Sequence, residues 1–225
     1  MKSFPKQEKQ KELFKQSLST RAYVKGQIPI TGRSLINYAN NMFPDMTKKQ
    51  LLDLMNKVDY LDIACGINHL YPKSLISQLK SNTKHHGLDI HSETTDNYVK
   101  GDIYNTSFSK SSYNVITINN FLYFWEYKPA NLLKIYKELH RILSEKGEIR
   151  VFPVFFGNYH QDNLELFEYL NTHFTIQLLK PKEYSKESPV YLKDGTIHQT
   201  DKGNGLTEYR ENKQLMSHTL VLRKF

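Results

Sequence analysis

A turn of small residues after a buried strand with an acid at its end is the feature of this chain that most directly suggests chemistry. Asp62 lies in the apolar run that begins at Tyr60, and the turn through Gly66 leads to Pro72. A parallel strand that ends beside a helix N-terminus presents free backbone N–H groups and a positive dipole end, and small residues let a ligand approach the main chain. The segment 60–72 is therefore typical of a nucleotide-like cofactor site.

Further polar residues end the next apolar runs. Asp89 closes the run that starts at His86, Asp102 follows Gly101, and a later run ends at Asn119. A carboxylate at the end of a parallel strand can accept hydrogen bonds from a ribose diol. The turn alone is a weak signal, because many α/β folds have one, so the argument depends on the whole series.

The elements that must position these residues are strands and helices in alternation. From residue 59 onward, short apolar runs separated by helical patterns indicate βαβ units and a mainly parallel sheet. The expected strands are 59–64, 85–89, 97–100, 114–118, 148–154, 174–179 and 218–223. The clearest helix has apolar residues in a 3.6-residue period from Leu132 to Leu143, with Gly147 as its stop signal, and another is expected at 162–171.

The chain divides into two expected parts. Residues 1–57 form an N-terminal helical lid segment, with helices at 5–19, 34–43 and 47–56, and residues 58–225 form the α/β domain. The stretch 181–214, rich in Lys, Gly, Asn and Glu, is expected to be a functional flap or a long mobile loop.

Composition indicates a globular protein of the cytoplasm. Hydrophobic residues make up 39% of the 225 residues, and Cys65 is the only cysteine, so no intrachain disulfide is possible. The sequence has neither the apolar stretch of a signal peptide nor a run long enough to span a bilayer, so we expect no membrane partner.

The net charge of +8 is concentrated near the N-terminus, where residues 1–57 hold eleven Lys/Arg and four Asp/Glu. Such a surface would attract acidic or phosphate-bearing partners in a salt-dependent way. A solvated helix surface is the favoured interpretation, because the excess is mostly lysine, whereas phosphate recognition favours arginine.

Taken together, the motifs resemble the class I S-adenosylmethionine (SAM) dependent methyltransferases over residues 59 to about 154. The acid and alternate glycines of their first motif are matched by Asp62, Ala64, Gly66 and Asn68. The sequences GLDI, GDIYNTSF, YNVITINNFLYFW and IYKELHRILSEKGEIRVF are similar to the segments that follow. The resemblance implies a Rossmann-like, doubly wound, mostly parallel seven-stranded sheet whose last strand is antiparallel.

Two departures from the family pattern concern its glycines. Ala64 is small enough to allow close approach, and Asn68 enters the left-handed region more easily than most residues. A nicotinamide-binding dehydrogenase is the rival interpretation and ranks lower, because Gly66 is the only glycine of the G-x-G-x-x-G pattern present here.

The resemblance also implies a set of cofactor contacts. Asp62 orients the methionine end, Asp89 holds the ribose hydroxyls and Asp102 contacts the adenine amine, although each acid is also a common turn or cap residue. The full set implied by the resemblance or by position consists of Asp62, Ala64, Cys65, Gly66, Asp89, Ile90, Asp102, Ile103, Asn119 and Arg33. Ile90 and Ile103 would sandwich the adenine ring. Arg33 reaches the cofactor carboxylate only if the N-terminal helices fold over the site, and a surface arginine is the alternative.

Residues that follow the fourth and fifth strands are the catalytic candidates. They are Asn119, Tyr123 and His160, with Trp125 as a further wall of the substrate pocket; packing is the alternative for the aromatic residues. A histidine beyond a strand end has the chemistry of a general base. His85, His86 and His91 do not form a metal site in this interpretation, because the adjacent pair points to opposite faces of a strand. Cys65 is expected to be a small buried residue rather than a nucleophile.

The sequence thus predicts methyl transfer from SAM to a nucleophilic O or N atom, with S-adenosylhomocysteine as the product. A small molecule is the preferred acceptor. Two alternatives stay open: an RNA- or protein-modifying enzyme that docks its nucleic acid or protein substrate on the basic segment, and a non-catalytic SAM-binding protein. The oligomeric state is not predicted.

Overall fold

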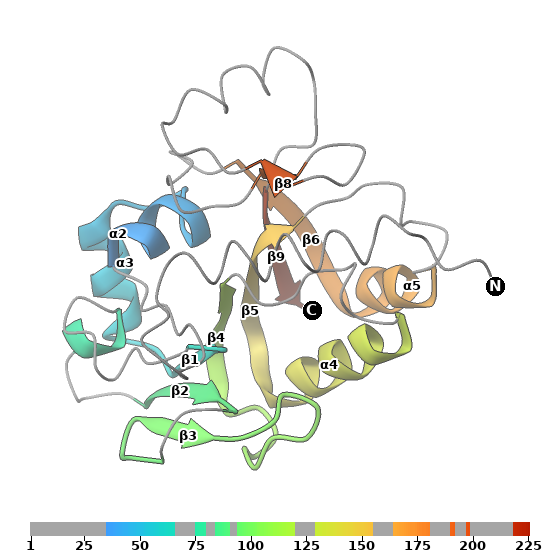
Figure 1. Cartoon of the computed structure of the whole chain (residues 1–225), viewed down its shortest axis with the longest axis horizontal. Coiled ribbons are helices and arrows are strands. Elements are labelled where there is room, and N and C mark those ends of the chain that lie inside the picture. Colours follow the sequence, from blue (N-terminus) through green and yellow to red (C-terminus); the bar gives the residue numbers. More distant parts are fainter. Residues whose placement is uncertain are drawn as a thin grey trace.

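A seven-stranded sheet with helices on both faces forms the centre of the computed structural model (Figure 1). The structure describes residues 35–65, 75–79, 84–90, 94–119, 129–154, 164–180, 190–191, 197–198 and 218–225. The strands are β1 (Tyr60–Ile63), β2 (His85–Asp89), β3 (Tyr98–Lys100), β4 (Tyr113–Asn119), β5 (Leu143–Val154), β6 (Phe174–Leu179) and β9 (His218–Lys224).

The strand order across the sheet is β3-β2-β1-β4-β5-β9-β6. Pairings among β1 to β5 are parallel, whereas β9 runs antiparallel to both β5 and β6. The predicted fold class is confirmed, including the single antiparallel strand, and each expected strand coincides with an observed one to within a few residues. Two short strands, β7 (Val190–Tyr191) and β8 (Ile197–His198), pair within the stretch 181–214; the rest of that stretch lies outside the described residues.

One face of the sheet is covered by α4 (Pro129–Ile142) and α5 (Leu164–His173) (Figure 1). The periodic residues of α4 that the sequence singled out are fully buried there: Leu132, Ile135, Tyr136, Leu139 and Ile142. They pack with Leu61, Ile116 and Ile149 of the sheet in one hydrophobic cluster. The 3.6-residue apolar period thus fixes which face of α4 meets the sheet.

The opposite face is covered by residues 35–57, which we call the N-terminal segment. It contains α2 (Leu35–Asn37), the π-helical turn η1 (Tyr38–Met42) and α3 (Lys48–Met55), and the short 3-10 helix η3 (Ile76–Gln78) packs beside it. Thr47 and Gln50 start α3 with reciprocal hydrogen bonds between side chain and backbone. The segment packs directly against the sheet. The lid prediction concerned residues 1–57, and of these 1–34 lie outside the described residues.

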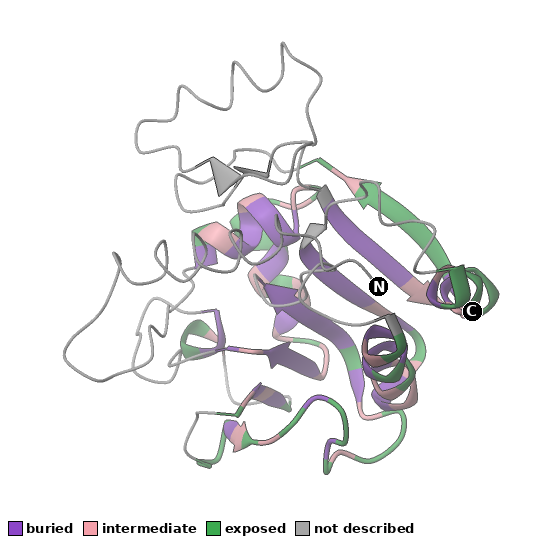
Figure 2. Ribbon diagram, turned by 45° about the vertical axis from the view of Figure 1, so that its right-hand side comes forward, coloured by how far each residue is buried: buried purple, intermediate pink, exposed green. Residues whose placement is uncertain are grey.

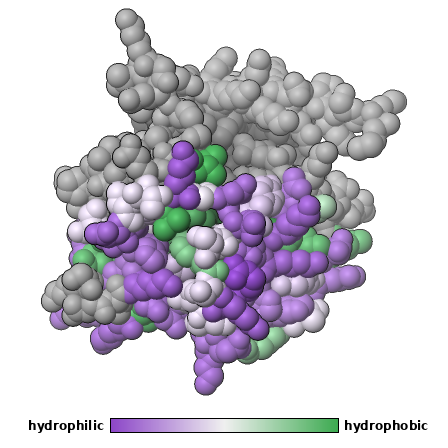
Figure 3. Space-filling model, turned by 90° about the horizontal axis from the view of Figure 1, so that it is seen from below, coloured by the Kyte–Doolittle hydropathy of each residue, from purple (hydrophilic) through white to green (hydrophobic). Residues whose placement is uncertain are grey.

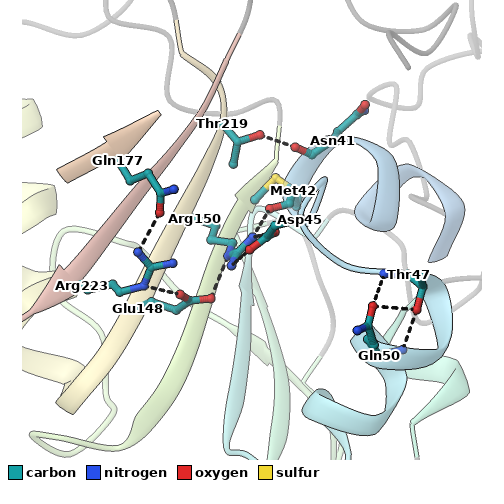
Figure 4. Close-up of polar contacts among 10 residues, drawn as sticks. All are labelled: Asn41, Met42, Asp45, Thr47, Gln50, Glu148, Arg150, Gln177, Thr219 and Arg223. Atoms are coloured by element: carbon teal, nitrogen blue, oxygen red, sulfur yellow. Dashed lines mark hydrogen bonds and ion pairs between the residues drawn. The ribbon is translucent and has the colours of Figure 1, made fainter. Parts of the chain in front are cut away.

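A buried arginine joins the N-terminal segment to the sheet (Figure 4). Arg150 on β5 has a side chain only 1% exposed and donates hydrogen bonds to the Asp45 carboxylate and to the carbonyl oxygen of Met42. Its guanidinium carbon also lies 4.2 Å from the ring centroid of Phe43. Glu148 accepts a further hydrogen bond from Arg150 at 2.7 Å, so the buried charge is paired on two sides.

The junction between α4 and β5 differs from the prediction. Gly147 was expected to stop the helix, but α4 ends at Ile142 and β5 begins at Leu143, so Gly147 lies inside the strand. The register with β4 shifts there, because Tyr113 pairs with Leu143 and Val115 pairs with Glu148. Lys146, one position before Gly147, has a φ of 61° and takes the left-handed conformation.

Burial decreases toward one edge of the sheet, as Figure 2 shows for β6 and the outer side of α5. Ile176 and Leu178 of β6 are 36% and 47% exposed. Seen from below, the described surface is mainly hydrophilic, with small separate hydrophobic patches (Figure 3). Among the described residues, no helix is long and apolar enough to cross a membrane.

Candidate functional site

The point where the strand order reverses brings the predicted residues to one edge of the sheet. β1 lies between β2 and β4, and its last residue, Ile63, is in register with Leu88 and Ile118. The next residues along these three strands are Ala64, Asp89 and Asn119. Ligands of open α/β sheets bind at the carboxyl ends of strands at such a switch point.

Asp62 lies beneath this edge with 1% of its surface exposed. The Tyr38 hydroxyl of the N-terminal segment donates a hydrogen bond to one carboxylate oxygen, and the Thr117 hydroxyl of β4 donates one to the other at 2.9 Å. Tyr60 and Thr117 are joined by a third hydrogen bond of 2.6 Å. Because the single hydroxyl proton of Thr117 goes to Asp62, Tyr60 must be the donor to Thr117.

The two tyrosines are held in their neutral, donating form. Burial, followed by the negative charge of Asp62, raises the pKa of Tyr38 well above its ordinary value, and the same two causes raise the pKa of Tyr60. Both phenols therefore keep their protons at neutral pH, and the network runs from Tyr60 through Thr117 to Asp62, with Tyr38 on the other side.

The turn after β1 is built on an unusual backbone conformation. Ala64 has φ 54°, in the left-handed region that favours glycine, and its N–H donates to the carbonyl oxygen of Leu88 at 2.8 Å. Cys65 is 3% exposed in the hydrophobic cluster under the N-terminal segment, as expected of a small buried residue. Gly87 makes room for it, since a Cβ on Gly87 would lie 2.7 Å from the Cys65 sulfur.

Asp89 and Ile90 lie at the adjacent strand end. Asp89 is partly exposed, and Ile90 is 54% exposed, which is a large apolar surface beside a carboxylate. The Asp89 carbonyl oxygen accepts a hydrogen bond from the Gly101 N–H at 3.2 Å, so the segment that leads to Asp102 is attached to the end of β2.

Asp102 and Ile103 occupy different environments from each other. Asp102 is exposed, and one of its carboxylate oxygens accepts a hydrogen bond from the Tyr104 N–H at 3.0 Å, which is the turn role named as its alternative. Ile103 is only 5% exposed within the main hydrophobic cluster, so it has little surface to offer an adenine ring. Tyr104, 37% exposed, is the neighbouring ring that has such a surface.

Hydrogen bonds attach the loop that carries Asp102 to α4. Glu138 accepts hydrogen bonds from the backbone N–H and the hydroxyl of Thr106, at 2.9 and 2.6 Å. Arg141 pairs with Glu138 at 2.7 Å and donates to the carbonyl oxygen of Phe108 at 2.9 Å. Partial burial opposes ionisation of Glu138, but its hydrogen bonds outweigh that effect and hold its pKa below the usual value.

Asn119, the last residue of β4, is 5% exposed and lies in register with Phe152 of β5. It is on the same sheet face as Thr117, because side chains alternate along a strand. The other predicted site residues, Gly66, Tyr123, His160 and Arg33, lie outside the described residues.

The histidine pair at the start of β2 points to opposite faces, as predicted. His85 hydrogen-bonds through Nε2 to the carbonyl oxygen of Met55 at 2.9 Å, and His86 through Nδ1 to the Tyr113 hydroxyl at 2.7 Å. Burial lowers the pKa of His86. Within the described residues, no three His, Cys, Asp or Glu side chains form a group that could hold a metal ion.

Sequence reasoning missed Tyr38 and Thr117. Tyr38 was assigned to the apolar series of a helix, which its 1% exposure confirms, but the series gives no indication of an acceptor for its hydroxyl. Thr117 was included in an expected strand without a role. A polar residue two positions before Asn119 on a buried strand was the only signal available for it.

Comparison with known proteins identifies a domain within the chain. A model described as a methyltransferase domain matches residues 61–151. This part of the chain is a methyltransferase domain. Its cofactor is S-adenosylmethionine, and the domain spans β1 to β5 with the turn at Ala64 near its start. A search of curated proteins gives no match.

Solved structures with a similar fold include other methyltransferases. A putative S-adenosylmethionine dependent methyltransferase from Listeria monocytogenes is 16% identical, with a TM-score of 0.48, and the match covers 79% of this chain and 96% of that one. A SAM dependent methyltransferase from Archaeoglobus fulgidus is 13% identical, with a TM-score of 0.43, and the match covers 84% and 98%. At these TM-scores the likenesses carry no argument about substrate.

Proposed function

We propose that this methyltransferase moves the methyl group of SAM to a nucleophilic O or N atom of a small molecule. The observation that carries the cofactor half of the proposal is the edge formed by Ala64, Asp89 and Ile90 at the switch point of the sheet. A partly exposed carboxylate beside an exposed apolar side chain fits a nucleoside, which has a diol at one end and a flat ring at the other.

In the proposed arrangement, Asp89 accepts hydrogen bonds from the ribose hydroxyls and Ile90 packs on one side of adenine. The exposed Tyr104 replaces the buried Ile103 as the candidate for ring contact on the other side. The Asp102 carboxylate accepts a hydrogen bond from the adenine amine, in addition to the one that it accepts from the Tyr104 N–H. One carboxylate has acceptor sites for both, since two oxygens offer about four lone pairs.

Asp62 acts from below the turn. Because it is 1% exposed, its charge reaches the cationic methionine end of SAM mainly through the field and through the turn it supports. Two opposite charges about 6 Å apart attract by roughly 3 kcal/mol at an effective dielectric constant of about 20. The negative charge thus favours an ammonium and sulfonium group over a pyrophosphate, which supports SAM over a dinucleotide.

The reaction itself needs little acid–base catalysis. SAM supplies the methyl group and a neutral thioether as the leaving group, so the protein must mainly align donor and acceptor and exclude water. Orientation of this kind is worth about 7–11 kcal/mol of barrier. Asn119 ends β4, one of the two strands beside β1, and is proposed to contact the cofactor and acceptor. Tyr123 and His160 remain proposed as pocket wall and base.

Calorimetry of SAM and S-adenosylhomocysteine binding tests the cofactor site. We expect Asp89→Ala to weaken both ligands at least tenfold. Asp96→Ala is the matched control, because it removes the same charge from an exposed position just before β3, at the amino-terminal end of the strands. It should leave both affinities unchanged. If the unmutated protein bound neither ligand, or if both variants weakened binding equally, the proposed site would be wrong.

The acceptor class needs a separate measurement. Release of S-adenosylhomocysteine is followed with small amines and hydroxylated molecules, RNA and protein as acceptors. The proposal is supported if a small molecule is methylated at a rate that changes little with salt concentration. Steeply salt-dependent turnover on RNA or protein that is lost on deleting residues 1–30 would instead favour the basic segment as a docking surface. Tight SAM binding with no turnover would indicate a non-catalytic SAM-binding protein.

A further inference from the structure

We propose that Tyr38 is a positioning residue for the cofactor: through its hydrogen bond to Asp62, the N-terminal segment sets how tightly the domain holds the amino-acid end of SAM. This inference rests on the proposed cofactor site. It adds a residue that lies before the part matched by the methyltransferase domain, at 61–151.

The geometry of the carboxylate supports this role. Asp62 is fixed by one hydroxyl on each oxygen: Thr117 belongs to the neighbouring strand, but Tyr38 comes from a separate element 24 residues earlier in the chain. Both donors are fully or almost fully buried, so water does not readily replace a lost hydroxyl. Removing the Tyr38 hydroxyl takes away one of the two hydroxyls that orient the Asp62 carboxylate, two residues before Ala64.

The segment that carries Tyr38 is itself attached to the sheet at a second place. The Tyr38 carbonyl oxygen accepts a hydrogen bond from the Phe43 N–H at 2.9 Å, which closes η1. Arg150 then contacts Met42, the last residue of η1, and Phe43 and Asp45 just beyond it. The segment that docks on β5 is thus the one that orients Asp62 on β1, so we expect a change at one contact to affect the other.

A double-mutant cycle on S-adenosylhomocysteine affinity tests the proposal. Tyr38→Phe removes only the hydroxyl, and we expect it to weaken binding about three- to tenfold. In an Asp62→Asn background, Tyr38→Phe should weaken S-adenosylhomocysteine binding much less, because the negative charge that Tyr38 positions is absent. An equal loss in both backgrounds, or no loss in the unmutated background, would overturn the proposal.

A second ligand separates positioning from general loosening of the fold. 5′-Methylthioadenosine has the nucleoside of the cofactor but lacks its amino-acid end, so Tyr38→Phe should weaken it less than twofold. If both ligands weakened by the same factor, Tyr38 would have only a structural role. This comparison needs no Asp62 variant, so it decides the question even where Asp62→Asn does not fold.

Tyr136→Phe is the matched control. Tyr136 is a fully buried tyrosine on α4, against the other face of the sheet, and its hydroxyl has no hydrogen-bond partner among the described residues. Loss of the Tyr136 hydroxyl should leave the affinities for S-adenosylhomocysteine and 5′-methylthioadenosine unchanged. Failure of the unmutated protein to bind S-adenosylhomocysteine would refute the proposed function itself, whereas binding that is indifferent to Tyr38→Phe would refute only this inference.

Discussion

Arg150 binds both carboxylate oxygens of Asp45, with N–O distances of 2.7 and 3.1 Å, across 105 residues of sequence. The pair joins the middle of the sheet to the turn between η1 and α3. Its two members differ in environment, since the side chain of Arg150 is 1% exposed and that of Asp45 is 36% exposed. The arginine therefore depends on its partners more than Asp45 does, because a buried charge without a partner is costly.

Asp45→Ala should lower the free energy of unfolding by about 1–3 kcal/mol, because it leaves the buried Arg150 with Glu148 as its only carboxylate partner among the described residues. Urea denaturation measures the change. Asp53→Ala on the exposed side of α3 is the control, with an expected effect within about 0.5 kcal/mol. Equal effects of the two variants would show that the Arg150 pair adds no stability.

Stability should also fall in acid. Partial burial opposes ionisation of Asp45, but the Arg150 hydrogen bonds outweigh it and hold the pKa of Asp45 below its usual 3.8. The pKa of Glu138 is likewise held below its usual 4.5. A carboxyl with a depressed folded-state pKa contributes stability above its unfolded-state pKa and loses it as pH falls through the folded value.

Urea midpoints should therefore be insensitive to these two groups above about pH 5 and should fall below about pH 4.5. Asp45→Asn should make the acid decline shallower, since asparagine does not titrate. A decline of unchanged steepness in that variant would mean that Asp45 ionisation is not linked to folding.

Ala64→Gly should stabilise the protein slightly or leave it unchanged, unlike most substitutions to glycine. A left-handed conformation costs a residue with a Cβ about 1–2 kcal/mol, and this penalty disappears in glycine, while the more flexible unfolded chain opposes the gain by about 0.4–1 kcal/mol. Ala39→Gly, in the buried π-helical turn, provides the contrast and should destabilise. A clear loss of stability in Ala64→Gly would argue against the φ of 54°.

The sequence predicted what local periodicity controls. Strands β2 and β6 begin and end at the predicted residues, but the apolar pattern of β6 does not determine its burial, since Ile176 and Leu178 are exposed. The antiparallel last strand came from the family resemblance, and the strand order was not predicted, because no local pattern encodes which strands become neighbours.

What escaped prediction depends on contacts between distant residues or on strained backbone. The Tyr38–Asp62 and Arg150–Asp45 pairs link elements whose mutual placement is settled only by packing. Ile103, which was expected at adenine, packs in the main hydrophobic cluster, and its contact with adenine stays a prediction. The left-handed Lys146 was missed because glycine, the residue that usually marks such a conformation, stands one position later.

Glu138→Gln should weaken cofactor binding without touching the cofactor. The Glu138 carboxylate joins the loop at Thr106 to Arg141, and a neutral amide weakens both the ion pair and the hydrogen bonds. We expect a loss of about 1–2 kcal/mol in stability and a two- to fivefold weaker affinity for S-adenosylhomocysteine by calorimetry. Glu168→Gln, exposed on α5, should change neither. Binding that stayed as tight as in the unmutated protein would mean that Asp102 does not depend on this attachment.

Gly87→Ala should be the most disruptive single methyl addition at the site edge. An added Cβ would lie 2.7 Å from both the Cys65 sulfur and a ring carbon of Tyr98, and the rigid ring cannot move away without displacing β3. Crowding of this kind costs about 1–3 kcal/mol, and it pushes on the turn that holds Ala64. Both the urea midpoint and the affinity for S-adenosylhomocysteine should therefore fall.

Gly101→Ala is the matched comparison, because its Cβ would meet only the flexible end of Leu88 at 2.8 Å. Its cost in stability should be well below that of Gly87→Ala. If the two alanine variants were equally stable, the close packing of Cys65 against β2 and β3 would not be the constraint that keeps glycine at position 87.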